Sequence, residues 1–92
     1  MHILIVEDDE VARDYLAKAL REVGHTVDVA GNGLEGLHLA SSIAVDLVIV
    51  DRMLPKLDGL ALVQSLRATG RKIPVLILSA LGDVDDRITG LR

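Results

Sequence analysis

Carboxylate side chains follow two apolar runs of this sequence, and their placement indicates a site for chemistry. Residues 3–6 run into acids that include Asp8 and Asp9, and residues 47–50 run into Asp51. A short, β-branched apolar run is typical of a strand that is buried on both faces. In an open sheet of parallel strands, ligands bind beyond the carboxyl ends of the strands. We therefore expect Asp8, Asp9 and Asp51 to meet at one edge of a sheet.

Three crowded carboxylates repel one another, because two charges about 4 Å apart interact by roughly 4 kcal/mol at an effective dielectric of 20. Such a cluster takes up a proton or binds a cation. Oxygen ligands without a nearby histidine or cysteine favour magnesium or manganese over zinc. Magnesium brings phosphate oxygens with it, and a carboxylate beside the ion can act as a nucleophile that forms an aspartyl phosphate. Ser79, which ends another apolar run, is placed to donate a hydrogen bond to a phosphoryl oxygen.

The acids also have a simpler explanation, because an acidic residue just before a helix is an ordinary N-cap. Taken singly, Asp8 and Asp9 are better explained in this way. Asp51 is not, because Pro55 and Asp58 indicate that the next helix starts well downstream. The joint pattern therefore favours a site over a coincidence of caps.

The elements that must hold these residues alternate strand and helix four times along the chain. The apolar pattern predicts strands at residues 2–6, 25–30, 46–50 and 75–78. Helices are expected to begin after Asp8 or Asp9, and after Asn32, Asp58 and Asp83. Connections of this length imply parallel strands with right-handed crossovers. The alternating segment 25–30 belongs at an edge and the continuous runs in the middle, which gives a doubly wound α/β sheet of order 2-1-3-4.

The helical periodicity also predicts which side chains face the sheet. For the first three helices these are Ala12, Leu16, Ala19, Leu20 and Val23, then Leu34, Leu37, Ala40 and Ile43, then Leu60, Val63 and Leu66. Arg13 is expected on the solvent side of the first helix, and Tyr15 is expected to be a half-buried packing residue. Gly24 and Gly70 are expected to end the first and third helices.

Composition narrows the range of functions. Ninety-two residues without cysteine make one domain with no disulfides and no thiolate metal site. We expect a cytoplasmic protein, since the chain shows neither a membrane span nor a secretory signal. The net charge of -4 argues against direct nucleic-acid binding. The outer edge of the fourth strand has nothing in the sequence to cover it, so we expect self-association through that edge or through the final helix.

Three segments give the sequence a resemblance to a known family: residues 3–9 (ILIVEDD), 51–59 (DRMLPKLDG) and 74–80 (PVLILSA). Together they resemble the receiver domain of two-component response regulators, whose fold is flavodoxin-like. The resemblance extends over residues 1–92. It implies a phosphoacceptor signalling domain rather than a turnover enzyme, with a sensor histidine kinase as partner and control of a DNA-binding transcription output domain that these residues do not include.

The same resemblance implies roles for individual residues. Asp51 would be the phosphoacceptor, and Ser79 would be the hydroxyl that reorients toward the phosphoryl group. Asp8 and Asp9 would hold Mg²⁺ together with Asp51, and the backbone carbonyl of Arg52 would be a further ligand.

The sequence departs from the family pattern at its end, where a fifth strand led by a lysine, and a fifth helix, would be expected. Lys56 and Lys72 do not occupy the place of that lysine. We therefore expect a C-terminally truncated receiver that binds magnesium weakly and is phosphorylated poorly, because the added charge of about -1.5 to -2 is less well neutralised.

Three other functions are considered. A flavodoxin-like cofactor binder would need a loop after the first strand that cradles phosphate, and the acids there would repel it. A magnesium-dependent phosphohydrolase would commonly carry an acid two residues after its nucleophile, where this chain has Met53. A truncated receiver could also serve as a structural module that exchanges a strand or a helix between chains without phosphotransfer.

Overall fold

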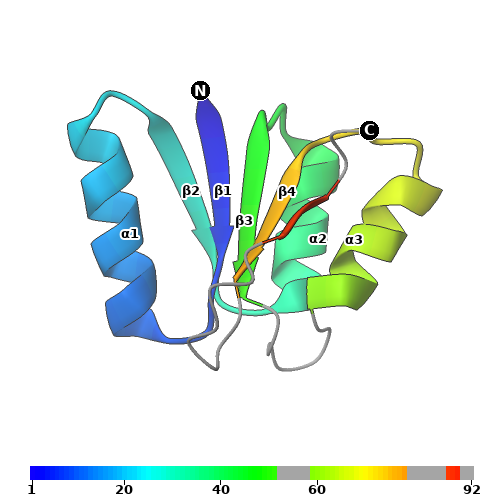
Figure 1. Ribbon diagram of the computed structural model, residues 1–92, viewed down its shortest axis with the longest axis horizontal. Coiled ribbons are helices and arrows are strands. Elements are labelled where there is room, and N and C mark those ends of the chain that lie inside the picture. Colours follow the sequence, from blue (N-terminus) through cyan, green and yellow to red (C-terminus); the bar gives the residue numbers. More distant parts are fainter. Residues whose placement is uncertain (52–58, 79–86, 90–92) are drawn as a thin grey trace.

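A sheet with helices on both faces forms the body of the protein (Figure 1). The computed structural model describes residues 1–51, 59–78 and 87–89. The strands are β1 (His2–Val6), β2 (Thr26–Ala30), β3 (Leu47–Asp51), β4 (Val75–Leu78) and β5 (Arg87–Thr89). The helices are α1 (Glu10–Glu22), α2 (Gly33–Ser42) and α3 (Gly59–Ala68). The strand order is β2-β1-β3-β4-β5, and the first four strands are parallel, which confirms the predicted 2-1-3-4 arrangement.

The strand order reverses at β1, which pairs with β2 on one side and β3 on the other. Val6, the last residue of β1, lies opposite Ala30 in β2 and Val50 in β3. The carboxyl ends of the three strands are therefore level with one another. This is the kind of edge at which α/β sheets bind ligands.

The outer edge of β4 is covered, contrary to the expectation from sequence. The short strand β5 pairs with it in antiparallel register, with Leu76 opposite Ile88. The helix expected after Asp83 is therefore wrong at residues 87–89, while residues 79–86 and 90–92 lie outside the described part of the chain. Backbone groups on an open sheet edge gain hydrogen bonds by pairing, and the β-branched residues at 88 and 89 suit a strand.

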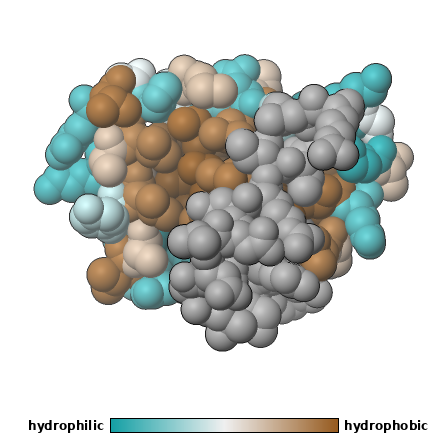
Figure 2. Space-filling view, viewed as in Figure 1, coloured by the Kyte–Doolittle hydropathy of each residue, from teal (hydrophilic) through white to brown (hydrophobic). Residues whose placement is uncertain are grey.

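The described helices cover the two faces of the sheet unequally. Helices α2 and α3 pack on the face that carries Leu4, Val6 and Val48. Helix α1 packs through Ala17 on the opposite face, which carries Ile3, Ile5, Val27 and Ile49. On that face Leu47, Leu76 and Leu78 are only half-buried, and Figure 2 shows apolar residues gathered beside α1.

The helix ends follow the predicted signals. The side chain of Asn32 accepts a hydrogen bond from the backbone N–H of Glu35 at 2.9 Å, which caps α2. Gly24 and Gly70 follow α1 and α3 with φ angles of +98° and +84°. These left-handed conformations favour glycine, because a Cβ atom would strain them.

The inner faces of the helices differ from the prediction at several positions. Ala17 is buried, while Ala19 and Val23, which were expected inside, are exposed. In α2 and α3 the expected inward residues Leu34 and Leu60 are exposed, and Leu62 is fully buried instead. The remaining predicted inward residues are buried or half-buried: Ala12, Leu16, Leu20, Leu37, Ala40, Ile43, Val63 and Leu66.

Gly36 allows α2 to approach the end of β1 closely. A Cβ atom built on Gly36 would lie 2.7 and 2.9 Å from the two methyl groups of Val6. Carbon atoms in ordinary contact are about 3.5–4.0 Å apart, so a side chain has no room there. This contact fixes Val6, the residue immediately before the acidic turn.

Candidate functional site

The carboxyl edge of the sheet brings together the ends of β1, β3 and β4, the strands that precede the predicted site residues. Val6 and Val50 are opposite each other. The next residue in each segment, Glu7 or Asp51, therefore lies at the same edge of the sheet, and the backbones of the two segments are neighbours there. Asp51 is the last residue of β3 rather than the first residue past it, and it is in register with Leu78. Ser79 is the next residue in the sequence after Leu78. The topology therefore assembles the segment ends that the sequence predicted.

Several predicted site groups lie outside the described residues. Arg52 and Ser79 are among them, together with Met53, Pro55 and Asp58 of the segment after Asp51, and of Asp51 the backbone alone is described. Among the side chains that the structure describes, which do not include the Asp51 carboxylate, no three His, Asp or Glu groups lie close enough together to hold a metal ion. The assignment of Asp8, Asp9 and Asp51 as metal ligands therefore stays a prediction.

Asp9 is the N-cap of α1. Its backbone is extended (φ -76°, ψ 111°), and its Oδ1 accepts a hydrogen bond from the backbone N–H of Val11 at 3.2 Å. The backbone carbonyl of Asp9 accepts the N–H of Arg13 at 2.9 Å, which starts the helical ladder. The simpler explanation of this acid is therefore confirmed, and one of its carboxylate oxygens is used by the helix.

Glu7, the first residue after β1, was missed as a candidate residue. It is half-buried, and its N–H donates to the carbonyl of Ala30 at 3.0 Å. Its Oε1 accepts the N–H of Asp9 at 3.0 Å. Asp8, between them, is exposed. The signal that could have identified Glu7 is its position directly after a buried strand, which is the argument that singled out Asp51.

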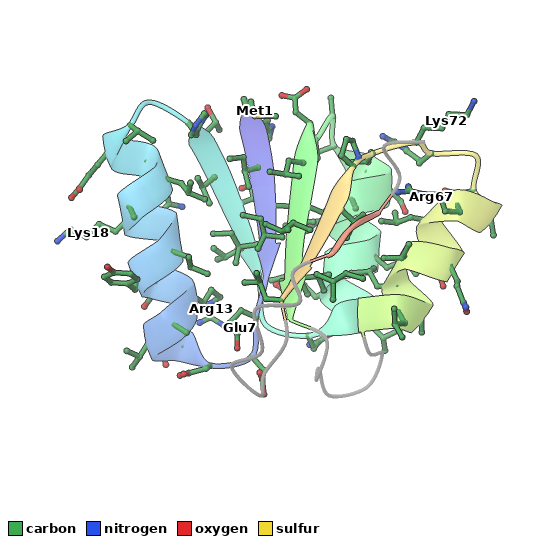
Figure 3. All side chains as sticks on the ribbon, in the orientation of Figure 1. Met1, Glu7, Arg13, Lys18, Arg67 and Lys72 are labelled. Carbon is green, nitrogen blue, oxygen red and sulfur yellow. The ribbon has the colours of Figure 1, made fainter. Side chains whose placement is uncertain are left out.

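Arg13 lies beside this turn and was also missed. Its side chain is 20% exposed rather than on the solvent side, and its Nη1 donates to the carbonyl of Glu7 at 3.4 Å. Figure 3 shows the two side chains next to each other at the end of β1. The helical periodicity puts Arg13 at the border of the inner face of α1, and its predicted place on the solvent side is wrong.

The donor chemistry of the turn fits a hard divalent cation. Glu7 and Asp8 supply carboxylate oxygens at the sheet's reversal point, where Asp51 also ends its strand. Magnesium prefers such ligands and retains several waters, so it does not need a closed cage of protein atoms. An exposed Asp8 and a half-buried Glu7 are compatible with that open coordination.

An exposed apolar stripe runs along α1, starting next to the acidic turn. Val11, Tyr15 and Val23 are 78%, 74% and 70% exposed, and Ala19 lies between them at the same helical spacing. Tyr15 was expected to be half-buried, and this prediction is wrong because the helix faces the sheet through Ala17. A shallow hollow of about 260 Å³ is lined by Tyr15, Lys18, Ala19 and Glu22.

Comparisons with known proteins agree with this geometry. A family model described as the response regulator receiver domain matches residues 3–92. Over 91 residues the chain is 50% identical to the probable transcriptional regulatory protein SilR of Salmonella typhimurium and 46% identical to the transcriptional regulatory protein CusR of Escherichia coli (strain K12). These matches cover 99% of this chain and 40% of each relative, so the chain spans less than half the length of these curated relatives.

Solved structures show the same likeness. The receiver domain of the Francisella response regulator 1452 superposes with a TM-score of 0.84 at 33% identity, covering 91% of this chain and 69% of that one. The response regulator TrrA of Thermotoga maritima, solved in complex with Mg²⁺-BeF, gives a TM-score of 0.81 at 34% identity, covering 86% of this chain and 69% of that one. In the described part of the protein, no helix has the length and apolar character of a membrane span.

Proposed function

Because the chain belongs to the receiver domain family of two-component response regulators, we propose that Asp51 is its phosphoacceptor and that a sensor histidine kinase is its phosphodonor. The observation that supports this assignment is the position of Asp51 at the end of β3, beside the acidic turn that follows β1. The Asp51 carboxylate attacks the phosphorus of a phosphohistidine, the P–N bond breaks, and an acyl phosphate forms. The receiver acts in the cytoplasm. It is not a turnover enzyme, because the phosphoryl group that it accepts remains on its own Asp51.

We propose that Glu7 and Asp8, with Asp51 and the backbone carbonyl of Arg52, hold the magnesium ion. Bound magnesium would neutralise part of the charge on the phosphoryl group. Asp9, predicted as a ligand from sequence, then serves the turn as the cap of α1. The structure of the relative TrrA with Mg²⁺-BeF supports magnesium as the metal of this family. The Ser79 hydroxyl donates a hydrogen bond to a phosphoryl oxygen and couples the modification to the loops around it.

A substitution series separates the two ligand sets. Asp9→Asn removes a charge and keeps an N-cap, since asparagine caps as well as aspartate. Asp8→Asn and Glu7→Gln should weaken magnesium binding by roughly tenfold or more. Asp9→Asn should have a much smaller effect, measured by isothermal titration of the chain with magnesium chloride. A loss in Asp9→Asn as large as that in Glu7→Gln would restore the assignment made from sequence.

Phosphorylation is tested with acetyl phosphate and magnesium, followed by intact mass measurement. We expect slow, partial, magnesium-dependent modification of the chain and none in Asp51→Asn. Equal modification of Asp51→Asn would refute Asp51 as the acceptor. Rapid stoichiometric modification would refute the expected weakness of phosphorylation in these 92 residues.

We propose that the kinase docks on the exposed apolar stripe of α1. The stripe starts at Val11, two residues after the Asp9 cap, so a partner seated on it is close to the carboxyl edge of the sheet. Tyr15→Ser and Val11→Ser should therefore slow transfer from a phosphorylated histidine kinase and leave modification by acetyl phosphate unchanged. Slowing of both reactions would show an effect on the site itself and refute the docking role.

The full response of the protein is proposed from its relatives. SilR and CusR are named as transcriptional regulatory proteins, so we propose that the phosphorylated receiver controls a DNA-binding output domain. A structural role through strand exchange at β4 has lost its main support, because β5 pairs with that edge. Self-association is tested by light scattering of the chain at increasing concentration.

A further inference from the structure

A positively charged residue, Arg13, lies beside the acidic turn. The guanidinium of Arg13 is mostly buried, and its Nη1 contacts the carbonyl of Glu7 at 3.4 Å (Figure 3). A Cβ atom built on Gly31 would lie 3.2 Å from the same Nη1, so the guanidinium also packs against the turn between β2 and α2. Arg13 therefore bridges the two turns that border the carboxyl edge of the sheet.

The hydrogen-bond partners of Arg13 do not account for its burial. Among the described residues, its buried Nε has no hydrogen-bond partner. Oδ1 of Asp14 lies 3.9 Å from that nitrogen, which is beyond hydrogen-bonding distance. A buried charge is costly unless opposite charge lies nearby. The acidic run of residues 7–10 lies just ahead of Arg13 in the chain, with Asp9 and Glu10 four and three residues before it.

We propose that Arg13 is the resident counter-cation of the acidic turn and that it sets the affinity of the site for magnesium. The inference rests on the metal site of the proposed function. Without metal, the guanidinium offsets the repulsion among the carboxylates and holds the carbonyl of Glu7 in place. A divalent ion that enters the same site is repelled by this fixed charge, so Arg13 stabilises the metal-free state and lowers the affinity for magnesium.

The sign of this effect separates it from a purely structural role. If Arg13 only shaped the turn, its removal would leave magnesium binding unchanged or weaken it. If its charge matters, Arg13→Gln should bind magnesium more tightly. Interaction of a divalent ion with a unit charge roughly 8 Å away in a water-like dielectric corresponds to about a fivefold change in affinity.

The matched control is Arg21→Gln. Arg21 lies on the same helix and also donates to a backbone carbonyl, that of Val27 at 2.8 Å, but it is near the opposite end of α1. Arg13→Lys keeps the charge and alters the geometry. Magnesium affinity is measured by isothermal titration, and the urea midpoint of unfolding is measured with and without saturating magnesium.

We expect Arg13→Gln to bind magnesium more tightly and to lose more stability in metal-free buffer than at saturating magnesium. Arg13→Lys and Arg21→Gln should bind as the unmodified chain does. Unchanged or weaker binding by Arg13→Gln, or tighter binding by Arg13→Lys, would overturn the inference. Failure of the unmodified chain to bind magnesium at all would instead refute the proposed metal site, and the inference with it.

Discussion

The contact between Gly36 and Val6 gives a prediction whose sign opposes helix propensity. In an ordinary helix interior, Gly→Ala stabilises by about 1 kcal/mol. In α2, the new methyl group would lie 2.7 and 2.9 Å from the methyl groups of Val6. Val6 is fully buried and paired on both sides by β2 and β3, so it cannot move away without shifting the sheet.

The expected magnitude follows from these two opposing effects. To restore an ordinary contact, the added methyl group and Val6 would have to move apart by about 1 Å. Overpacking of a buried site costs roughly 1–3 kcal/mol, which exceeds the propensity gain. Gly36→Ala should therefore lower the free energy of unfolding by up to about 2 kcal/mol in a urea titration. The melting temperature of a domain of this size should fall by up to several degrees.

A second substitution identifies the cause. Val6→Ala alone should cost about 2–3 kcal/mol, because it removes two buried methyl groups. In that background, Gly36→Ala should be neutral or stabilising, since the clash is gone and the helix propensity remains. Additive losses in the double variant, or stabilisation by Gly36→Ala alone, would refute the argument from close packing.

Three further substitutions or deletions test the fold. Asn32→Ala should lower the free energy of unfolding by about 1 kcal/mol through loss of the α2 cap, while Asn32→Asp should be tolerated in the same urea titration. Gly24→Ala should also cost about 1 kcal/mol, for backbone reasons alone, because nothing lies within 4 Å of the added Cβ and φ is +98°. Removal of residues 87–92 unpairs the outer edge of β4, and light scattering should then show increased self-association; a monomer at high concentration would contradict this.

The sheet could be predicted from the sequence because its strands are short, β-branched and separated by clear helix signals. The bounds of β1 and β4 agree with the prediction, and the alternating pattern of β2 correctly indicated an edge. β5 could not be predicted, because a three-residue strand depends on the free edge of β4 more than on its own residues. The local signal at Asp83 favoured a helix instead.

The inner face of α1 was harder to read because this helix has two apolar stripes. Val11, Tyr15, Ala19 and Val23 form the exposed stripe, and Ala17 belongs to the buried one. Alanine fits either face, so the pattern alone could not place the helix to within about one residue, or 100°. Packing on the sheet buries the face with Ala17, and Arg13 is then half-buried at the border of the two stripes.

The roles of the three acids depend on the path of the backbone rather than on residue type. Glu7 continues β1 through its hydrogen bond with Ala30, Asp8 is exposed in the turn, and Asp9 starts the helix. From the sequence alone, all three carboxylates are candidate ligands of a metal ion. Once the strand and the helix are defined, Asp9 belongs to the helix as its cap, and Glu7, the first residue after β1, becomes a candidate ligand in its place.

The acidic turn is therefore held by residues that would never touch a phosphoryl group. Val6 is held by its close packing against Gly36 in α2, and the carbonyl of Glu7 accepts a hydrogen bond from Arg13. Gly36→Ala should for this reason weaken magnesium binding. The control is Ile73→Val, which should lower the free energy of unfolding by about 1 kcal/mol but leave magnesium binding unchanged, because Ile73 is buried just before the amino end of β4, away from the acidic turn. Equal magnesium affinities in the two variants, measured by isothermal titration at matched folded fractions, would show that the packing under β1 supports stability alone and does not shape the site.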